Sequence, residues 1–400
     1  MAGSFFIEKL QDCAAETDPP KQFTFAIMRV SKEKDQKIMF VMPEYRKPDF
    51  SASVFCDAPD VKMEKCVKDG VVPEYFHSTS IYPEYFKIDG EWLLAEESRM
   101  DSCVVYRPLE KKLEVIEQRN VKAGDLVILG RSERCEEGIY LHVNGFDEDS
   151  GEIDDQFKFR ANRSRETAFA RDYETLYELF RYEKDHGKIV FVMGPACSFD
   201  YDSRKAMQSL TEKGYVHGLL AGNALATHDL EAGLLGTSLG QDIYTQKSQP
   251  NGHYNHLDVL NRVRRCGSIP KFIEEYKIDN GIIYGLVKNN IPFVLTSSIR
   301  DDGPLPEVIA DAYQGQSAMR NMLRDATTVV CLATQLHSIA SGNMIPSFRV
   351  VDGVVRPVFF YCVDISEFVT NKLHDRGSLG AVTLVTNVQD FVCLLDKGVK

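Results

Sequence analysis

The chain lacks the short motifs that mark the commonest classes of site. No stretch of its 400 residues spells GxGxxG, Walker A, HExxH or CxxC, so the usual fingerprints of dinucleotide, phosphate and metal binding are missing. Its ten cysteines never fall at metal-ligand spacing, and Cys197, Cys331 and Cys362 lie inside apolar runs. Cysteines in such runs are typical of small buried residues in a reducing compartment. We therefore expect no metal site.

Positive charge and long apolar runs are also scarce. The formal net charge is -12, and the richest basic run, Arg262 to Arg265, is short and predicts a solvated helix face. Without a basic stripe, nucleic acid and anionic membranes are not expected partners. No run approaches the roughly 18 apolar residues of a membrane span, and the start of the chain, with Glu8, does not resemble a signal peptide. We predict a cytoplasmic protein that acts on a small molecule.

The pattern of apolar and polar residues differs between the first and second parts of the chain. We interpret residues 1–21 as a tail, 22–150 as a β-rich domain, 151–186 as a linker followed by a helix, and 187–400 as a second, catalytic domain. Acidic residues and glycines between positions 145 and 155 favour the linker. Apolar and β-branched runs predict strands in the first domain at 23–30, 37–42, 102–106, 125–129 and 138–143, and a helix at 173–185.

Beyond residue 187, apolar runs alternate with helical patterns. The expected strands are 188–193, 218–221, 293–295, 328–332 and 357–363, and the expected helices are 203–213, 281–289, 308–322, 335–341 and 366–373. Such alternation is typical of a parallel sheet covered on both faces. The predicted fold class is α/β, with a doubly wound, mainly parallel, Rossmann-like sheet and a smaller β-rich N-terminal domain.

Ligands of such sheets bind beyond the carboxyl ends of the strands, and the segments there are small and polar. Gly194 and Pro195 open a strand-to-helix turn that is either a phosphate site or a plain connection. Asn223 and Ala224 follow the next strand, where Asn223 either binds a ribose or caps a helix. Asp229, or Glu231 beyond it, is a further candidate for the ribose hydroxyls.

The loop from 297 to 306 is the most unusual of these segments. Ser297 and Ser298 precede Arg300, Asp301 and Asp302, and two prolines stiffen the end of the loop. Like charges held side by side suit recognition of an amine, or an acid or base with a shifted pKa. An exposed turn is the alternative, but it would rarely need both prolines and the serine pair.

Two later segments complete the candidate site. His337 titrates near neutral pH and could act as a general acid or base, or it could be a satisfied structural histidine. Asn343 follows just beyond the end of the same expected helix. Asp364 ends the last expected strand, where it either faces a cofactor or caps the next helix.

Together these segments resemble a known family. Leu220 to Ala224, Gly236 to Gly240, Ser298 to Pro306 and Leu336 to Met344 look like the archaeal-type ornithine cyclodeaminases and the C-terminal module of arginine dihydrolase/ornithine cyclodeaminase fusions. Residues 70 to 101 resemble the LOR/SDH region that precedes that module. A more distant similarity runs to deoxyhypusine synthase, although the imine-forming lysine of that family would fall near Leu336.

The resemblance implies an NAD-dependent ammonia-lyase that converts L-ornithine to L-proline and ammonia. In the mechanism that the resemblance implies, NAD⁺ would take a hydride from Cα to give an imine, the δ-amine would attack that imine and ammonia would leave, and NADH would return the hydride to the cyclic imine. It also implies a homo-oligomer, because related folds hold the cofactor at subunit contacts. The implied roles are proton transfer and amine binding by Asp301 and Asp302, proton transfer by His337, carboxylate or pyrophosphate binding by Arg300, and NAD contacts from Asn223, Ala224, Thr237 and Ser238.

Two other functions stay open from the sequence. One is an NAD-dependent enzyme that acts on another diamine or amino acid, such as lysine or a polyamine. The other is an NAD-binding sensor that has lost its chemistry. The joint presence of Asp301, Asp302 and His337 favours an enzyme over the sensor.

Overall fold

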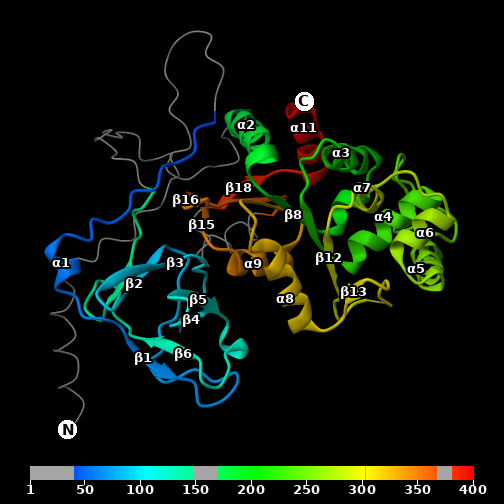
Figure 1. Ribbon diagram of the computed structural model, residues 1–400. Helices are drawn as coiled ribbons and strands as arrows, with labels where there is room; N and C mark the ends of the chain where they lie inside the picture. The colour runs from blue at the N-terminus through cyan, green and yellow to red at the C-terminus, as the bar shows by residue number, and fades with distance from the viewer. Residues whose placement is uncertain (1–39, 147–169, 302, 367–380) are drawn as a thin grey trace, which may run out of the picture.

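The computed structural model describes residues 40–146, 170–301, 303–366 and 381–400. Within them an antiparallel β-rich region precedes a larger region built on one parallel sheet (Figure 1). The predicted fold class is therefore confirmed. The expected tail, the strand at 23–30 and residues 367–373 of the expected helix at 366–373 lie outside the described residues, and the three boundaries between the four expected segments stay predictions.

Two antiparallel sheets form the N-terminal region. One has the order β1-β6-β4-β5 and the other the order β3-β2-β7. Their inward side chains, among them Phe86, Val104 and Ile128, make one apolar core. The elements are α1 (Ser53–Cys56), β1 (Lys62–Lys65), β2 (Glu84–Ile88), β3 (Glu91–Ala95), β4 (Cys103–Arg107), β5 (Lys112–Ile116), η1 (Gln118–Asn120), β6 (Leu126–Leu129) and β7 (Ile139–Leu141).

The parallel sheet carries the rest of the fold. Its order is β13-β12-β9-β8-β14-β17-β18, and every neighbouring pair is parallel. The chain builds outward from β8 in one direction and then returns to the other side of β8, which is the doubly wound arrangement. The strands are β8 (Ile189–Met193), β9 (Gly218–Gly222), β12 (Phe293–Thr296), β13 (Val308–Ile309), β14 (Thr328–Leu332), β17 (Phe359–Asp364) and β18 (Ala381–Val385).

Helices cover both faces because successive strand residues point to opposite sides. Phe191 packs in the core cluster with residues of α2, α3, α4 and α11, whereas Val190 and Val192 pack with residues of α8 and α9. Figure 1 shows α8 and α9 on the opposite side of the sheet from α2, α3 and α11. The helices are α2 (Ala170–His186), α3 (Tyr201–Glu212), α4 (Asn223–Leu235), α5 (Asn255–Cys266), α6 (Ile269–Glu275), α7 (Ile282–Lys288), α8 (Ala312–Leu323), α9 (Gln335–Met344) and α11 (Val388–Gly398).

Three expected elements differ in the structure, and one of them is the strand expected at 37–42, because its described residues 40–42 lie in no strand. The helix expected at 308–322 begins only at Ala312, because Asp311 caps it by accepting from the backbone N–H of Gln314, and β13 takes the first two positions. The strand expected at 357–363 is split: Pro357 ends β16 (Val354–Pro357), which pairs with β15 (Phe348–Val351), and β17 starts at Phe359. Proline fits there because it has no N–H to donate to a continuing ladder.

The two regions contact each other along α8 and the segment before β15. Arg320 on α8 forms an ion pair with Glu117, which follows β5 (Nε to Oε1, 2.6 Å). Ser347 donates its hydroxyl to the carbonyl of Ile81. No helix among the described residues is long and apolar enough to cross a membrane.

Candidate active site

The strand order reverses between β8 and β14, and the two strand ends are in close contact there. Gly194, the residue after β8, donates its N–H to the carbonyl of Leu332 (2.8 Å). A Cβ on Gly194 would lie 1.9 Å from the carbonyl oxygen of Ala333, so only glycine fits. Pro195 begins η3 (Pro195–Ser198) immediately afterwards. Packing accounts for this glycine, and a phosphate contact at Gly194 and Pro195 stays a prediction.

Asn223 joins the end of β9 to the loop after β12. It is the first residue of α4 and is buried. Its Oδ1 accepts the backbone N–H of Leu305 (3.0 Å) and lies 3.5 Å from the hydroxyl of Thr227. Because Leu305 belongs to the loop from 297 to 306, the structure brings together two segments that the sequence separates by 82 positions. Ala224, half-buried, follows in the first turn of α4.

His337 reaches the same area from the other side of the switch point. Its Nε2 lies 3.1 Å from the hydroxyl of Thr296, the last residue of β12. Gly222, at the end of β9, leaves room for the ring: a Cβ there would lie 3.3 Å from its Cε1. Burial lowers the pKa of His337 below its ordinary value of 6.5, so the imidazole is neutral at neutral pH. Thr296 is a site residue that the sequence analysis did not identify, whereas Gly222 lies within the motif from Leu220 to Ala224.

The loop after β12 turns around Asp301. The Asp301 carboxylate accepts the backbone N–H of Ser298 (2.8 Å) and lies 3.2 Å from its hydroxyl. Ser297 donates its hydroxyl to the carbonyl of Ala310 (3.2 Å). Arg300 is exposed to solvent. Asp302 lies outside the described residues, so the structure describes one carboxylate of the expected pair.

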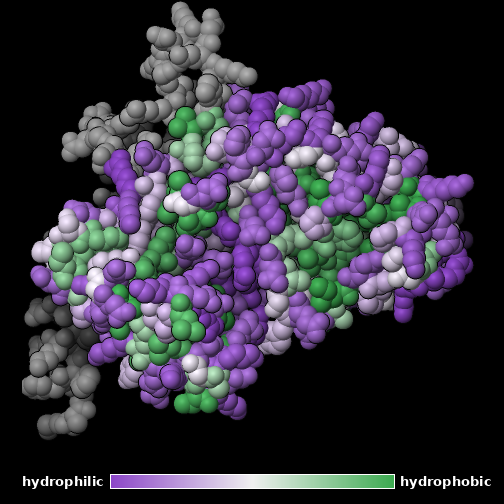
Figure 2. All heavy atoms as spheres, in the orientation of Figure 1, coloured by the Kyte–Doolittle hydropathy of each residue, from purple (hydrophilic) through white to green (hydrophobic). Residues whose placement is uncertain are grey.

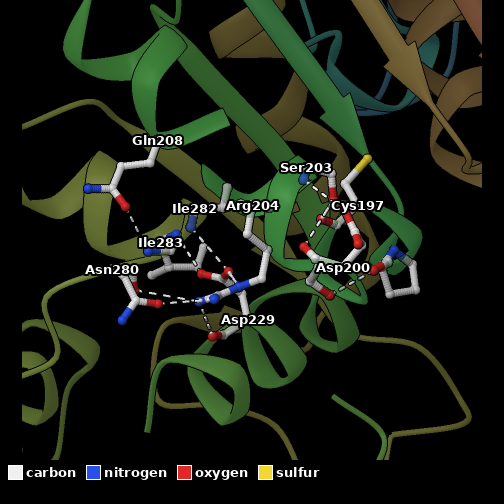
Figure 3. A network of polar contacts seen from close by, with 12 residues as sticks. Cys197, Asp200, Ser203, Arg204, Gln208, Asp229, Asn280, Ile282 and Ile283 are labelled. Atoms are coloured by element: carbon white, nitrogen blue, oxygen red, sulfur yellow. Dashed lines mark hydrogen bonds and ion pairs between the residues drawn. The ribbon is translucent and has the colours of Figure 1, made fainter. Parts of the chain in front are cut away.

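Asp229 has other partners than a ligand. One of its oxygens accepts from Arg204 Nε (2.8 Å) and from the N–H of Ile282, and the other accepts from the N–H of Ile283. Figure 3 shows this buried network, in which Arg204 also contacts Asn280. Asp229 therefore neutralises a buried arginine and holds the start of α7. We leave it out of the cofactor site proposed below.

A second buried carboxylate, Glu231, organises the segment from Gly236 to Gly240. It accepts from the Thr237 hydroxyl (2.8 Å) and from the backbone N–H of Leu239 (3.0 Å) and Gly240 (2.9 Å). His228 Nδ1 lies 3.1 Å from the same carboxylate. Thr237 thus has a structural partner. Both carboxylate oxygens of Glu231 therefore already accept hydrogen bonds from the protein itself, which disfavours a ribose contact.

The segment also spells GxSxG, a pattern of serine hydrolases when it joins a strand to a helix. Here Gly236 ends α4, and Ser238 lies in β10 (Thr237–Ser238) of the hairpin with β11 (Gln241–Asp242). The Ser238 hydroxyl is buried and has no hydrogen-bond partner among the described residues. The strand-turn-helix geometry that would expose and activate it is missing, so the segment is not a nucleophile elbow.

Asp364 lies next to the switch point between β8 and β14, whereas Asn343 lies farther from it. Asp364 ends β17 and accepts the N–H of Ser366 (2.8 Å). The N–H of Ala333 donates to the carbonyl of Val363, so Asp364 lies next to the switch point. Asn343 is near the far end of α9, about 9 Å along the helix axis from His337. The structure thus links Asn223 with Leu305 and His337 with Thr296. Asp364 lies one strand further along the sheet, and Asn343 lies away from this centre.

Comparison with known proteins decides the family. Residues 174–395 match the family model described as arginine dihydrolase ArgZ-like, C-terminal, Rossmann fold. The chain is 37% identical over 399 residues to an ornithine cyclodeaminase of Methanocaldococcus jannaschii, covering 99% of this chain and 89% of that protein. The chain belongs to the ornithine cyclodeaminase family. It is an enzyme of that type, and the resemblance inferred from the sequence motifs is confirmed.

The match extends further than the motifs indicated. It takes in nearly the whole chain, whereas the motifs supported it only from about Gly70 onward. Among solved structures, a LOR/SDH protein of Methanococcus maripaludis aligns with a TM-score of 0.77 at 36% identity, covering 85% of this chain and 98% of that one. The ternary complex of AgrE with ornithine and NAD⁺ aligns with a TM-score of 0.54 at 35% identity, covering 86% of this chain but 46% of AgrE.

Proposed function

We propose that this family member converts L-ornithine to L-proline and ammonia with NAD. The observation that carries the proposal is the convergence of strand-end residues, with Thr296 meeting His337 and Asn223 holding the 297–306 loop. The relatives named ornithine cyclodeaminase, and the AgrE structure whose complex holds ornithine and NAD⁺, support the same chemistry. Bound NAD would supply an acceptor that takes a hydride from Cα and returns it.

The residues at the switch point fit a dinucleotide. Gly194 permits close approach between the ends of β8 and β14, and ligands of doubly wound sheets lie at that crevice. We assign Gly194, Pro195 and Asp364 to the nucleotide, with Asn223 and Ala224 on the β9 side. Ser297 and Ser298 border the site from the β12 loop. Thr237 and Ser238 stay predicted NAD contacts.

His337 is the residue we assign to proton transfer. Because burial keeps its ring neutral at neutral pH, one nitrogen is free of a proton and can accept one from a substrate amine. The Thr296 hydroxyl holds Nε2 at 3.1 Å and thereby sets the orientation of the ring. The same proton can then be delivered to the departing amine as ammonia leaves.

The 297–306 loop is assigned to the substrate. Asp301 and Asp302 would pair with the amines, and Arg300 with the carboxylate or with the pyrophosphate. Ornithine carries its own nucleophile, so the δ-amine attacks within one molecule and needs no protein nucleophile. The imine-forming lysine of deoxyhypusine synthase would fall near Leu336, which cannot form an imine, and this favours that route.

We also propose a homo-oligomer in which the site lies near a subunit contact. Three exposed apolar side chains flank the candidate site: Ile299 in the β12 loop, Leu336 at the start of α9 and Leu239 beside Gly240. Figure 2 shows hydrophobic residues gathered over the part of the molecule where Figure 1 places β12. Mass measurement by light scattering tests this proposal, and a monomer at working concentration would contradict it.

The deciding experiment follows labelled ornithine through one turnover. With NAD and no added reductant, we expect proline and ammonia in equal amounts. Ornithine deuterated at Cα should give proline that keeps its deuterium, and ¹⁵N at the α-amine should leave as ammonia. Lysine and putrescine are the parallel substrates. Turnover of either without turnover of ornithine would replace the proposed substrate, and NAD binding without any turnover would favour a sensor.

Two substitutions test the loop. Asp301→Asn and Asp302→Asn should each keep NAD binding and lower turnover, because the amide cannot hold a protonated amine as an ion pair. Calorimetric titration with NAD, run beside the proline assay, separates the two effects. Full turnover in either variant would remove that residue from the proposed mechanism.

A further inference from the structure

Four arginines are among the seven residues that line a small cavity between the two regions. It is a shallow recess that is open to solvent. Glu97 is the one acidic residue in the lining, and α8 contributes to one wall. The lining residues are Glu97, Arg99, Arg320, Arg324, Met344, Pro346 and Arg349. This cavity lies outside the candidate active site.

Arg99 is satisfied by Glu117 and by the carbonyls of Glu97 and Val115, but the guanidinium of Arg320 is not. Glu117 pairs with both Arg99 (2.7 Å) and Arg320 (2.6 Å) through the same oxygen, Oε1. Arg320 is only 6% exposed, and this ion pair is the single polar contact recorded for its guanidinium among the described residues. A guanidinium has five N–H donors, so most of its capacity is unused.

Arg349 and Arg324 are also only partly satisfied by acidic residues. Arg349 contacts Asp325 through Nη2 (3.4 Å), while its Nη1 is buried without a hydrogen-bond partner among the described residues. Arg324 Nε lies 3.5 Å from Glu97. Burial, together with the neighbouring arginines, lowers the pKa of Arg320 to about 10 in spite of the attraction of Glu117. Positive charge therefore exceeds negative charge in this cavity.

Buried donors without acceptors cost free energy, and a folded chain seldom keeps several together. A ligand with many acceptor oxygens would satisfy them. The planar guanidinium fork matches phosphate and carboxylate groups. A phosphate dianion offers more oxygens than a carboxylate, and they point in several directions. It can therefore bond to guanidinium groups that converge from both regions of the chain.

We propose that this cavity binds a phosphate group, either free phosphate or a phosphate monoester, and that its occupancy is transmitted along α9 to the candidate active site. Met344 lines the cavity at one end of α9, and His337 lies near the other end. The helix has ten residues and is about 15 Å long. The second half of the proposal rests on the proposed function, whereas the binding half does not.

Binding is tested by calorimetric titration with inorganic phosphate at constant ionic strength, with glycerol phosphate and chloride in parallel. We expect phosphate or the monoester to bind and chloride not to bind. Arg349→Gln and Arg324→Gln should each weaken binding about tenfold or more, because each removes a charged hydrogen-bond donor. The matched control is Arg265→Gln, an exposed arginine on α5 that lies 3.9 Å from Glu275, and it should bind phosphate like the parent.

Equal binding by the parent, the cavity variants and the control would overturn the site. If the monoester alone binds, the source is a phosphorylated metabolite rather than free phosphate. Absence of binding by both phosphate probes would also overturn the proposal. None of these measurements needs NAD or ornithine. The phosphate site can therefore be disproved while the proposed function stands, and the proposed function can be disproved while the phosphate site stands.

Transmission along α9 is tested by measuring the Kd of NAD with and without phosphate. We expect about fivefold tighter NAD binding with phosphate, because a held α9 fixes Ala333 and Thr334, which precede the helix and lie beside Gly194, and the coupling must be reciprocal. Arg349→Gln should abolish the effect. Weaker NAD binding that persists in Arg349→Gln would instead indicate competition at the nucleotide site, and an unchanged Kd would overturn the transmission.

Discussion

His337 Nε2 lies 3.1 Å from the hydroxyl of Thr296, although the strands that precede these residues are not neighbours. Thr296 ends β12 and His337 follows β14, and both β9 and β8 lie between them in the sheet. The contact exists because α9 carries His337 across the ends of the intervening strands, next to Gly222. This histidine therefore marks the centre of the candidate site.

Replacing His337 should remove proton transfer but leave the fold intact. We expect His337→Gln to lower kcat for proline formation by roughly 100-fold to 10,000-fold, the usual contribution of a general acid or base. NAD affinity should change little. The control is His253→Gln, an exposed histidine outside the site, which should keep parent activity. A kcat within threefold of the parent for His337→Gln would show that another group moves the proton.

Activity should depend on pH through the neutral form of His337. Burial lowers the pKa of His337 below 6.5. We therefore expect kcat/KM to stay constant from neutral pH to pH 6.5 and to fall only as the pH drops through the lowered pKa. The profile of proline formation against pH measures the midpoint. A midpoint above 6.5, or activity that increases in acid, would contradict the assignment of this histidine as a base.

The lowered pKa of His337 also makes the stability of the fold depend on pH. Between the lowered pKa and 6.5 the unfolded chain binds a proton at His337 that the folded chain does not. The contribution of this residue to stability is therefore complete above pH 6.5 and is lost as the pH falls. Denaturant unfolding at about pH 7.5 and about pH 5.5 should show a larger loss for the parent than for His337→Gln. Equal losses would contradict the shift.

Breaking the Arg204–Asp229 pair should destabilise the protein more than any exposed ion pair. Both side chains are almost fully buried, and removing one partner leaves a buried charge uncompensated, which costs about 3–5 kcal/mol. We expect Asp229→Asn to lower the free energy of unfolding by that order. Lys288→Gln, which breaks an exposed pair with Glu212, should leave it unchanged. If Asp229→Asn weakened NAD binding without loss of stability, a ribose contact would be restored to the proposed site.

Gly194 should tolerate no side chain. A Cβ would lie 1.9 Å from the Ala333 carbonyl oxygen, so Gly194→Ala must separate the ends of β8 and β14. We expect a loss of about 1–3 kcal/mol of stability and weaker NAD binding. Gly285→Ala in α7 is the control, because its nearest contacts are at ordinary distances of 3.4–3.7 Å. Parent-like NAD affinity in Gly194→Ala would remove the strand-end crevice from the nucleotide site.

Local patterns carried most of the fold prediction. Ile189–Met193 and Thr328–Leu332 are continuous apolar runs that became central strands of the parallel sheet. Buried β2 was not predicted, although all five of its residues are buried. It contains Glu84 and Lys87, whose charges make its pattern look like a surface segment, and only tertiary contacts such as Glu84 with His77 satisfy them.

The sequence alone determined the alternation of strands and helices, the polar segments at the strand ends and the motifs of the family, because each depends on residues close together along the chain. Tertiary structure alone decided which of those segments meet. Asp229 pairs with Arg204, Thr296 meets His337, and arginines from both regions line one cavity. These contacts join positions far apart in the chain, and they form only when the sheet order and the helix packing have brought their elements together.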